Sequence, residues 1–175
     1  MKRKIITFLL IIVCFIVQTT VWNLFPLSTV KPNILLILTV SMGLMRGKHT
    51  GLWVGFISGL IIDLFYGTIF GFNALVYMYI GYLNGNCYKV FYDEDIKTPM
   101  LLVTVSEFAY NLVFYVVQFA FRQRFDFSTY FVHIILPEAL YTIILTLLLY
   151  KLFYIINRKL MANELEDSDS PWLLK

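Results

Sequence analysis

Residues 47–71 read GKHTGLWVGFISGLIIDLFYGTIFG, and glycine recurs at four-residue intervals except where Asp63 takes its place. Residues four apart lie near one face of a helix. In a membrane, close backbone approach drives helix association, and small residues permit that approach. Gly51, Gly55 and Gly59 are therefore expected to form a shallow groove on one helix. The groove is either a helix-packing surface inside a bundle, which we favour, or an interface with a partner protein.

The composition of the whole chain supports a membrane setting for this groove. The chain has 175 residues, of which 59% are hydrophobic and only 14% are charged. A soluble domain cannot bury that much apolar surface. The 16 Phe, 12 Tyr and 3 Trp are typical of the aromatic belts at membrane interfaces, and a net charge of +3 gives no indication of nucleic-acid binding. We predict an all-α integral membrane protein.

Apolar runs divide the chain into six predicted transmembrane helices. They cover about residues 5–22, 33–44, 51–66, 69–83, 100–121 and 130–156. The second run is short for a span of about 20 residues, so it is either unusually tilted or begins before Pro32. We expect residues 1–160 to form a six-helix transmembrane domain and residues 161–175 to form an acidic cytoplasmic tail.

The distribution of Lys and Arg predicts the orientation of these six helices. With the N-terminus in the cytoplasm, most basic residues fall at the cytoplasmic side, and Lys31, Arg122 and Arg124 fall outside. The positive-inside rule favours this arrangement, which also places the C-terminus in the cytoplasm. The basic stretch MRGKH, residues 45–49, is expected to contact anionic lipid head groups.

Ionisable and amide side chains inside the predicted helices form a second group of candidate residues. A charged group at the bilayer centre costs roughly 2.5–3.5 kcal/mol, so each should face protein or water. We interpret them as a buried polar clasp that fixes the geometry of the bundle. A carrier coupled to protons or cations is a weaker alternative, because the carboxylates are expected at different depths. The clasp residues are Asp63, Asn73, Glu107, Asn111 and Glu138.

Two of these residues come with specific structural expectations. Asp63 lies near the outer end of its helix, where Asn73 or the arginines at 122 and 124 could be its partners. Glu107 and Asn111 are four apart and therefore share a helix face. Pro137, beside Glu138, lacks a backbone donor and predicts a kink in the last helix.

Motifs for catalysis or cofactor binding are absent from the sequence. There is no nucleophile–histidine–acid arrangement and no glycine-rich phosphate loop in a suitable context. The two histidines and two cysteines lack the spacing of metal ligands. We therefore predict a protein that is not an enzyme and has no cofactor and no metal.

The order and spacing of several residues resemble the MreD family of bacterial rod shape-determining membrane proteins. The resemblance is strongest over residues 32–85. Asn33 departs from the family, which often has an acidic residue after this proline. The residues that carry the resemblance are Pro32, Arg46-Gly47, Gly51, Gly55, Gly59-Leu60, Asp63, Gly71, Asn73-Ala74 and Gly81-Tyr82.

The resemblance implies a non-enzymatic, multi-pass component of the cell-elongation machinery in the bacterial cell membrane. Such a component would organise lateral peptidoglycan synthesis and maintain rod shape through protein contacts. The implied partners are MreC, RodA with its penicillin-binding transpeptidase, MreB filaments indirectly, and membrane lipids. The family is also similar in fold to the substrate-binding subunits of energy-coupling-factor transporters, so a vitamin-binding transporter subunit is the alternative. Those subunits carry small residues on the first helix, whereas here the small residues lie on the third.

Overall fold

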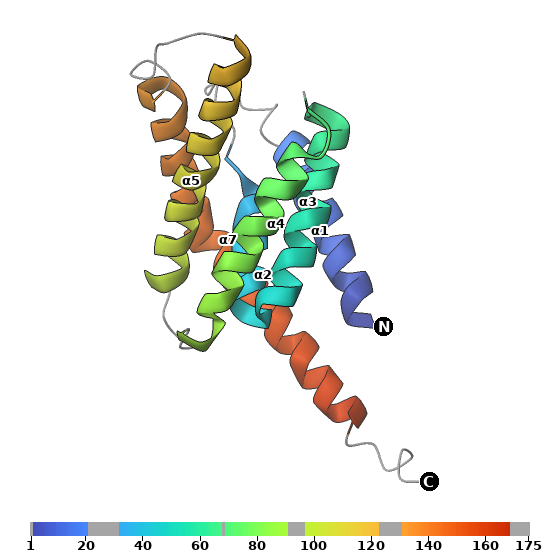
Figure 1. Ribbon diagram of the computed structural model, residues 1–175. Coiled ribbons are helices and arrows are strands. Elements are labelled where there is room, and N and C mark those ends of the chain that lie inside the picture. The colour runs from blue at the N-terminus through green and yellow to red at the C-terminus, as the bar shows by residue number, and fades with distance from the viewer. Residues whose placement is uncertain (1, 21–31, 68, 91–96, 123–130, 169–175) are drawn as a thin grey trace.

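The computed structural model describes residues 2–20, 32–67, 69–90, 97–122 and 131–168, and all regular secondary structure in these ranges is helical (Figure 1). A short 3₁₀ turn, η2, follows α4, and one π-helical turn, η3, precedes α7. The helices are α1 (Lys2–Thr20), α2 (Ile34–Arg46), α3 (Lys48–Tyr66), α4 (Phe72–Asn86), η2 (Cys87–Val90), α5 (Lys97–Arg122), η3 (Phe131–Ile135) and α7 (Leu136–Ser168).

Helix α2 is the centre of the bundle. Every residue from Ile34 to Met45 is buried, and α1, α3, α4, α5 and α7 all contact this helix. An apolar surface on all sides is the pattern of a helix surrounded by protein. The hydroxyl groups of Thr39 and Ser41 donate to carbonyl oxygens one turn back, so they need no outside partner.

The ends of α2 are defined by local interactions. The side chain of Asn33 accepts a hydrogen bond from the amide of Leu36 at 3.3 Å and so caps the first turn. At the other end Gly47 has φ 85°, a left-handed conformation that disfavours other residues. The chain reverses there and enters α3 at once. The second predicted span is therefore a short central helix that begins two residues after Pro32.

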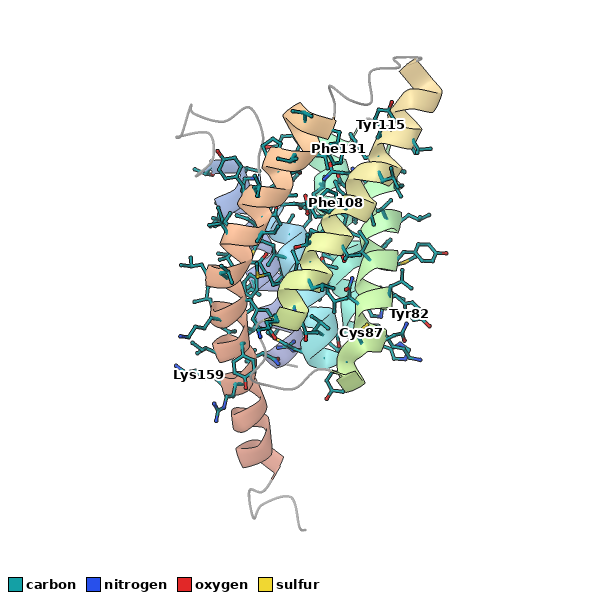
Figure 2. All side chains as sticks on the ribbon, turned by 90° about the vertical axis from the view of Figure 1, so that its left-hand side faces the viewer. Tyr82, Cys87, Phe108, Tyr115, Phe131 and Lys159 are labelled. Carbon is teal, nitrogen blue, oxygen red and sulfur yellow. The ribbon has the colours of Figure 1, made fainter. Side chains whose placement is uncertain are left out.

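Helices α5 and α7 lie beside each other on one side of α2 (Figure 1). The rings of Phe108 on α5 and Phe131 on η3 stack with their centroids 6.5 Å apart, and both are labelled in Figure 2. The π-helical turn ends immediately before α7, and Pro137 is the second residue of that helix. Proline is well tolerated there because the first amides of a helix have no intrahelical acceptor. The kink predicted at Pro137 within the last helix is not found, because Pro137 lies in the first turn of α7.

Within the described part of the chain, three helices are long and apolar enough to cross a membrane, namely α3, α5 over Lys97–Val117 and α7 over Leu136–Leu160. The apolar stretches Lys4–Thr20 of α1 and Ile34–Arg46 of α2 are shorter. Helix α7 continues to Ser168, so residues 161–168 of the expected tail are helical, while residues 169–175 lie outside the described residues. The start of α1 and the end of α7 lie at the same end of the bundle, with the last turns of α7 projecting beyond the other helices (Figure 1).

The central position of α2 predicts which leucines matter for stability. Leu36 is fully buried, whereas 71% of Leu148 on α7 is exposed at the bundle surface. Leu36→Ala should lower the free energy of unfolding by roughly 2–5 kcal/mol, because it opens a cavity that neighbours cannot fill. Leu148→Ala is the matched control and should change the melting temperature in detergent little. Equal effects would contradict the central placement of α2.

Candidate functional site

The three glycines predicted to form a groove lie on the face of α3 that packs against α4. A Cβ atom on any of them would collide with a backbone carbonyl oxygen of α4. The two helices accordingly form the most extensive helix contact among the described residues. The pairs are Gly51 with Gly81, Gly55 with Tyr77 and Gly59 with Asn73. The groove is thus occupied by another helix of the same chain.

Small residues on α4 and α2 complete this contact. A Cβ on Gly81 would collide with the carbonyl oxygen of Gly51, so each helix needs a glycine opposite the other. A Cβ on Gly43 of α2 would lie 2.9 Å from the Gly81 oxygen and 3.3 Å from the Gly85 nitrogen. Helices α2, α3 and α4 therefore approach one another backbone to backbone. Gly81 and Gly85 stand four residues apart on α4, and a packing role for this pair was not predicted from the sequence.

Asp63 lies at the end of α3 and caps the start of α4. Its Oδ1 accepts hydrogen bonds from the Asn73 amide at 3.2 Å and the Asn73 side-chain nitrogen at 2.9 Å, and its Oδ2 accepts from the Ala74 amide at 2.9 Å. The residue in the capping position itself, Gly71, has no side chain to do this. A carboxylate at a helix N-terminus also interacts favourably with the helix dipole. Asn73, one of the two partners anticipated for Asp63, is therefore in contact with it.

Asn73 links this cap to α5. The hydroxyl of Tyr110 donates to Asn73 Oδ1 at 2.9 Å. The Tyr110 ring then meets the Tyr77 ring edge-on, with their centroids 5.4 Å apart. One polar chain therefore connects α3, α4 and α5. Tyr77 and Tyr110 were not among the predicted site residues, because an aromatic residue in an apolar segment carries no sequence signal of a buried hydroxyl partner.

Glu107, Asn111 and Glu138 form a second polar cluster between α5 and α7. Glu107 is fully buried, and the Asn111 side-chain nitrogen lies 3.4 Å from its Oε1 and 3.2 Å from its carbonyl oxygen. Glu138 of α7 lies beside this pair, and the Glu107 Oε2 atom has no hydrogen-bond partner among the described residues. The cluster therefore places two carboxyl groups and one amide side by side between α5 and α7.

Asn33 and Tyr77 lie close to both clusters. The Tyr77 hydroxyl donates to Asn33 Oδ1, and the Asn33 amide donates to Thr142 Oγ1 of α7 at 3.3 Å. Asn33 could have been found from sequence, because an Asn before an apolar run is a common helix cap. Its contact with Tyr77 depends on the fold and has no sequence signature.

A third polar group, at the basic end of the bundle, involves Arg46. Its Nε donates to Asn157 Oδ1 at 2.5 Å, and its Nη1 donates to Thr7 Oγ1 at 2.7 Å. The arginine at the end of α2 therefore ties α1 to α7. Separately, Asn84 of α4 donates to Ser106 of α5 at 2.8 Å. Neither contact was anticipated, since single Asn, Ser and Thr residues are frequent in apolar segments.

The predicted clasp thus forms two clusters. Asp63 and Asn73 meet at the α3–α4 end, while Glu107, Asn111 and Glu138 meet between α5 and α7. The arginine at 124 lies outside the described residues, and the side chain at 122 is likewise not described, so that alternative partnership of Asp63 remains a prediction. Across the described ranges, no group of three His, Cys, Asp or Glu side chains is placed to hold a metal ion.

These features define a class of protein: a helical membrane protein with a polar interior held by backbone-close helix packing. The comparison with protein families is more specific. The family described as rod shape-determining protein MreD matches residues 2–160, nearly the whole chain, and the chain belongs to this family. The resemblance seen in the sequence is confirmed. Neither the comparison with curated proteins nor the comparison with solved structures gives a match.

The glycine contact gives the first prediction for the site. Gly55→Leu should force α3 away from α4, because its side chain would occupy the position of the Tyr77 backbone. We expect a melting temperature lowered by at least several degrees and less folded protein in the membrane. Ala109→Leu adds comparable bulk at an exposed position of α5 and serves as the control. Wild-type stability of Gly55→Leu would contradict the close contact.

The cap formed by Asp63 gives a graded prediction. Asp63→Ala leaves two buried amides and the Asn73 side chain without acceptors, at a cost of about 1–3 kcal/mol for each amide. Asp63→Asn keeps one acceptor oxygen and should lose less. Thermal unfolding in detergent measures both variants. If Asp63→Asn abolishes function while its stability is close to wild type, the negative charge itself is needed, and a purely structural cap is excluded.

The paired carboxyl groups give a third prediction. Glu107→Gln keeps the volume of the side chain and the oxygen that accepts from Asn111, so it should retain most of the stability. Glu107→Ala removes that acceptor and opens a cavity in the bundle, and should cost roughly 2–5 kcal/mol, as for other large-to-small changes at buried positions. Thermal unfolding of the two variants checks this order. A Gln variant as unstable as the Ala variant would show that the carboxyl group itself is needed for stability.

Proposed function

We propose that this protein is a non-enzymatic assembly component of the bacterial cell-elongation machinery. It organises lateral peptidoglycan synthesis by holding other membrane proteins together. Membership of the rod shape-determining MreD family is the observation that carries this proposal. The partners expected for it are MreC, RodA and the penicillin-binding transpeptidase that works with RodA, with MreB filaments engaged indirectly.

The distribution of polar and apolar side chains supports an assembly role. In the interior, Asn73 of α4 donates to Asp63 of α3, and Asn111 donates to Glu107 within α5. The lateral faces of the outer helices are apolar, and such faces suit contacts with other membrane helices. Exposed apolar side chains include Leu9 and Ile16 on α1, Leu101 and Val116 on α5, and Ile144 and Leu148 on α7.

We propose six membrane spans with both termini in the cytoplasm, in the bacterial cell membrane. The start of α1 and the end of α7 lie at one end of the bundle (Figure 1). Lys48, Arg158 and Lys159 are exposed in the helical ends on that side, and Lys159 is labelled in Figure 2. A basic end of this kind is the one that faces the cytoplasm under the positive-inside rule.

The proposal is tested by depleting the protein from its native cell and restoring single variants. Depletion should convert rods to round cells, and the wild-type chain should restore rods. Ala109→Leu should also restore them, whereas Gly55→Leu should not, because it disrupts the α3–α4 contact. Cell dimensions are measured by microscopy, with membrane protein levels as the control. Rod shape maintained throughout depletion would overturn the proposal.

Affinity purification in mild detergent tests the partners separately. The tagged protein should recover MreC, RodA and the transpeptidase, identified by mass spectrometry. Recovery of a transport ATPase and its coupling protein would instead support the alternative of a transporter subunit.

A further inference from the structure

A pocket lies between α1 and α3 at the basic end of the bundle. The two helices meet at their other ends, where the ring of Phe15 lies 5.0 Å from that of Phe65 and 6.3 Å from that of Tyr66, measured between centroids. They diverge from there toward the start of α1 (Figure 1). The divergence leaves a cavity of about 540 Å³. Of the polar clusters described above, the Arg46 group contributes to the lining of this cavity and the other two do not.

The lining of this α1–α3 pocket changes from basic to apolar along its length. Lys4, Arg46 and His49 lie at the basic end, and Phe8, Val54 and Ile57 are among the side chains farther in. Lys4 to Ile11 and His49 to Ile57 each cover two turns of helix, so the pocket runs about 10–12 Å along the helices. No acidic side chain is among the described residues that line it.

The arginine at this end is held in place. Its two hydrogen bonds, to Thr7 and Asn157, fix the guanidinium group between α1 and α7. Lys4 and His49 are exposed beside it. Trp53, 61% exposed and also part of the lining, offers an indole N–H at the level where tryptophan typically meets lipid head groups. The basic end of the α1–α3 pocket therefore combines the fixed positive charge of Arg46 with additional hydrogen-bond donors.

The chemistry that fits such a pocket has an anionic head and an apolar tail. A cavity with a few polar groups at one end of an apolar wall is the usual form of a ligand site, and its volume lies within the common range of about 300–1,000 Å³. A helix about 10 Å wide would need roughly 900 Å³ over the same length, so it would remain largely outside. A lipid acyl chain is narrow enough to enter.

We propose that the α1–α3 pocket binds an anionic phospholipid of the cytoplasmic leaflet. Its phosphate lies against Lys4, Arg46 and His49, and its acyl chain lies against Phe8, Val54 and Ile57. The site goes beyond the proposed assembly role and rests only on the orientation that places the basic end in the cytoplasm. A lipid bound there would fill the space between α1 and the rest of the bundle.

Binding to purified protein tests the site directly. The full-length protein is delipidated in detergent and titrated with phosphatidylglycerol or phosphatidylcholine, and bound lipid is counted by native mass spectrometry. Phosphatidylglycerol should bind at least about fivefold more tightly. Lys4→Gln should weaken it about fivefold, the effect of one basic charge near a lipid surface. Lys48→Gln removes an equal charge at the same end but outside the lining, and should leave binding unchanged.

A second variant tests the apolar part. Ile57→Trp should fill the inner end of the pocket and reduce binding of phosphatidylglycerol by at least about tenfold, with the melting temperature confirming that the protein is folded. Equal binding of the two lipids, or equal effects of Lys4→Gln and Lys48→Gln, would overturn the proposal and indicate nonspecific surface charge.

Photocrosslinking in the native membrane distinguishes a lipid from a protein occupant. A photoreactive phenylalanine analogue placed at position 53 should form adducts with phospholipid. Adducts with another protein in place of lipid would overturn the proposal and identify the pocket as a docking site for a partner. Because the binding assay uses the purified protein alone, its outcome does not depend on the assembly role.

Discussion

The close contact between the backbones of α3 and α4 is the constraint on which the rest of the structure depends. Lipid gives helices no hydrophobic reason to associate, so the contact relies on dispersion between atoms that only glycine lets approach. Gly51 and Gly81 each leave room for the other's carbonyl oxygen. This contact sets the position of α4 along α3. It thereby brings the start of α4 to Asp63, whose carboxylate accepts from the buried amides of Asn73 and Ala74.

The polar interior then connects the α3–α4 unit to the remaining helices. Asn73 accepts from Tyr110 of α5, and Asn33 couples Tyr77 to Thr142 of α7. A buried polar group without a partner is costly in an apolar surrounding, so each bond selects one relative placement of the helices. This member of the rod shape-determining MreD family is therefore a helix bundle with a fixed polar interior and apolar outer faces. Such an arrangement suits the assembly role proposed above.

The sequence contained most of the fold and a part of the site. Composition and apolar runs were enough to predict a helical membrane protein, and the glycine spacing marked the face of α3 that α4 covers. Asp63 with Asn73, and Glu107 with Asn111, were also grouped as the structure groups them. Periodicity within one helix cannot say which helices become neighbours. The roles of Tyr77 and the pairing of Arg46 with residues of α1 and α7 therefore had no sequence signal. The helical extension of α7 through residues 161–168 was missed because that stretch is too polar for an apolar pattern.

The burial of α2 has a consequence for how the protein is made. Helix α2 has 13 residues, and a helix of that length extends about 20 Å, less than the hydrocarbon thickness of about 30 Å. Gly47 joins it directly to α3, which is long enough to span. Because α5 and α7 also contact α2 and follow it in the chain, α2 is fully enclosed only after those helices have been made.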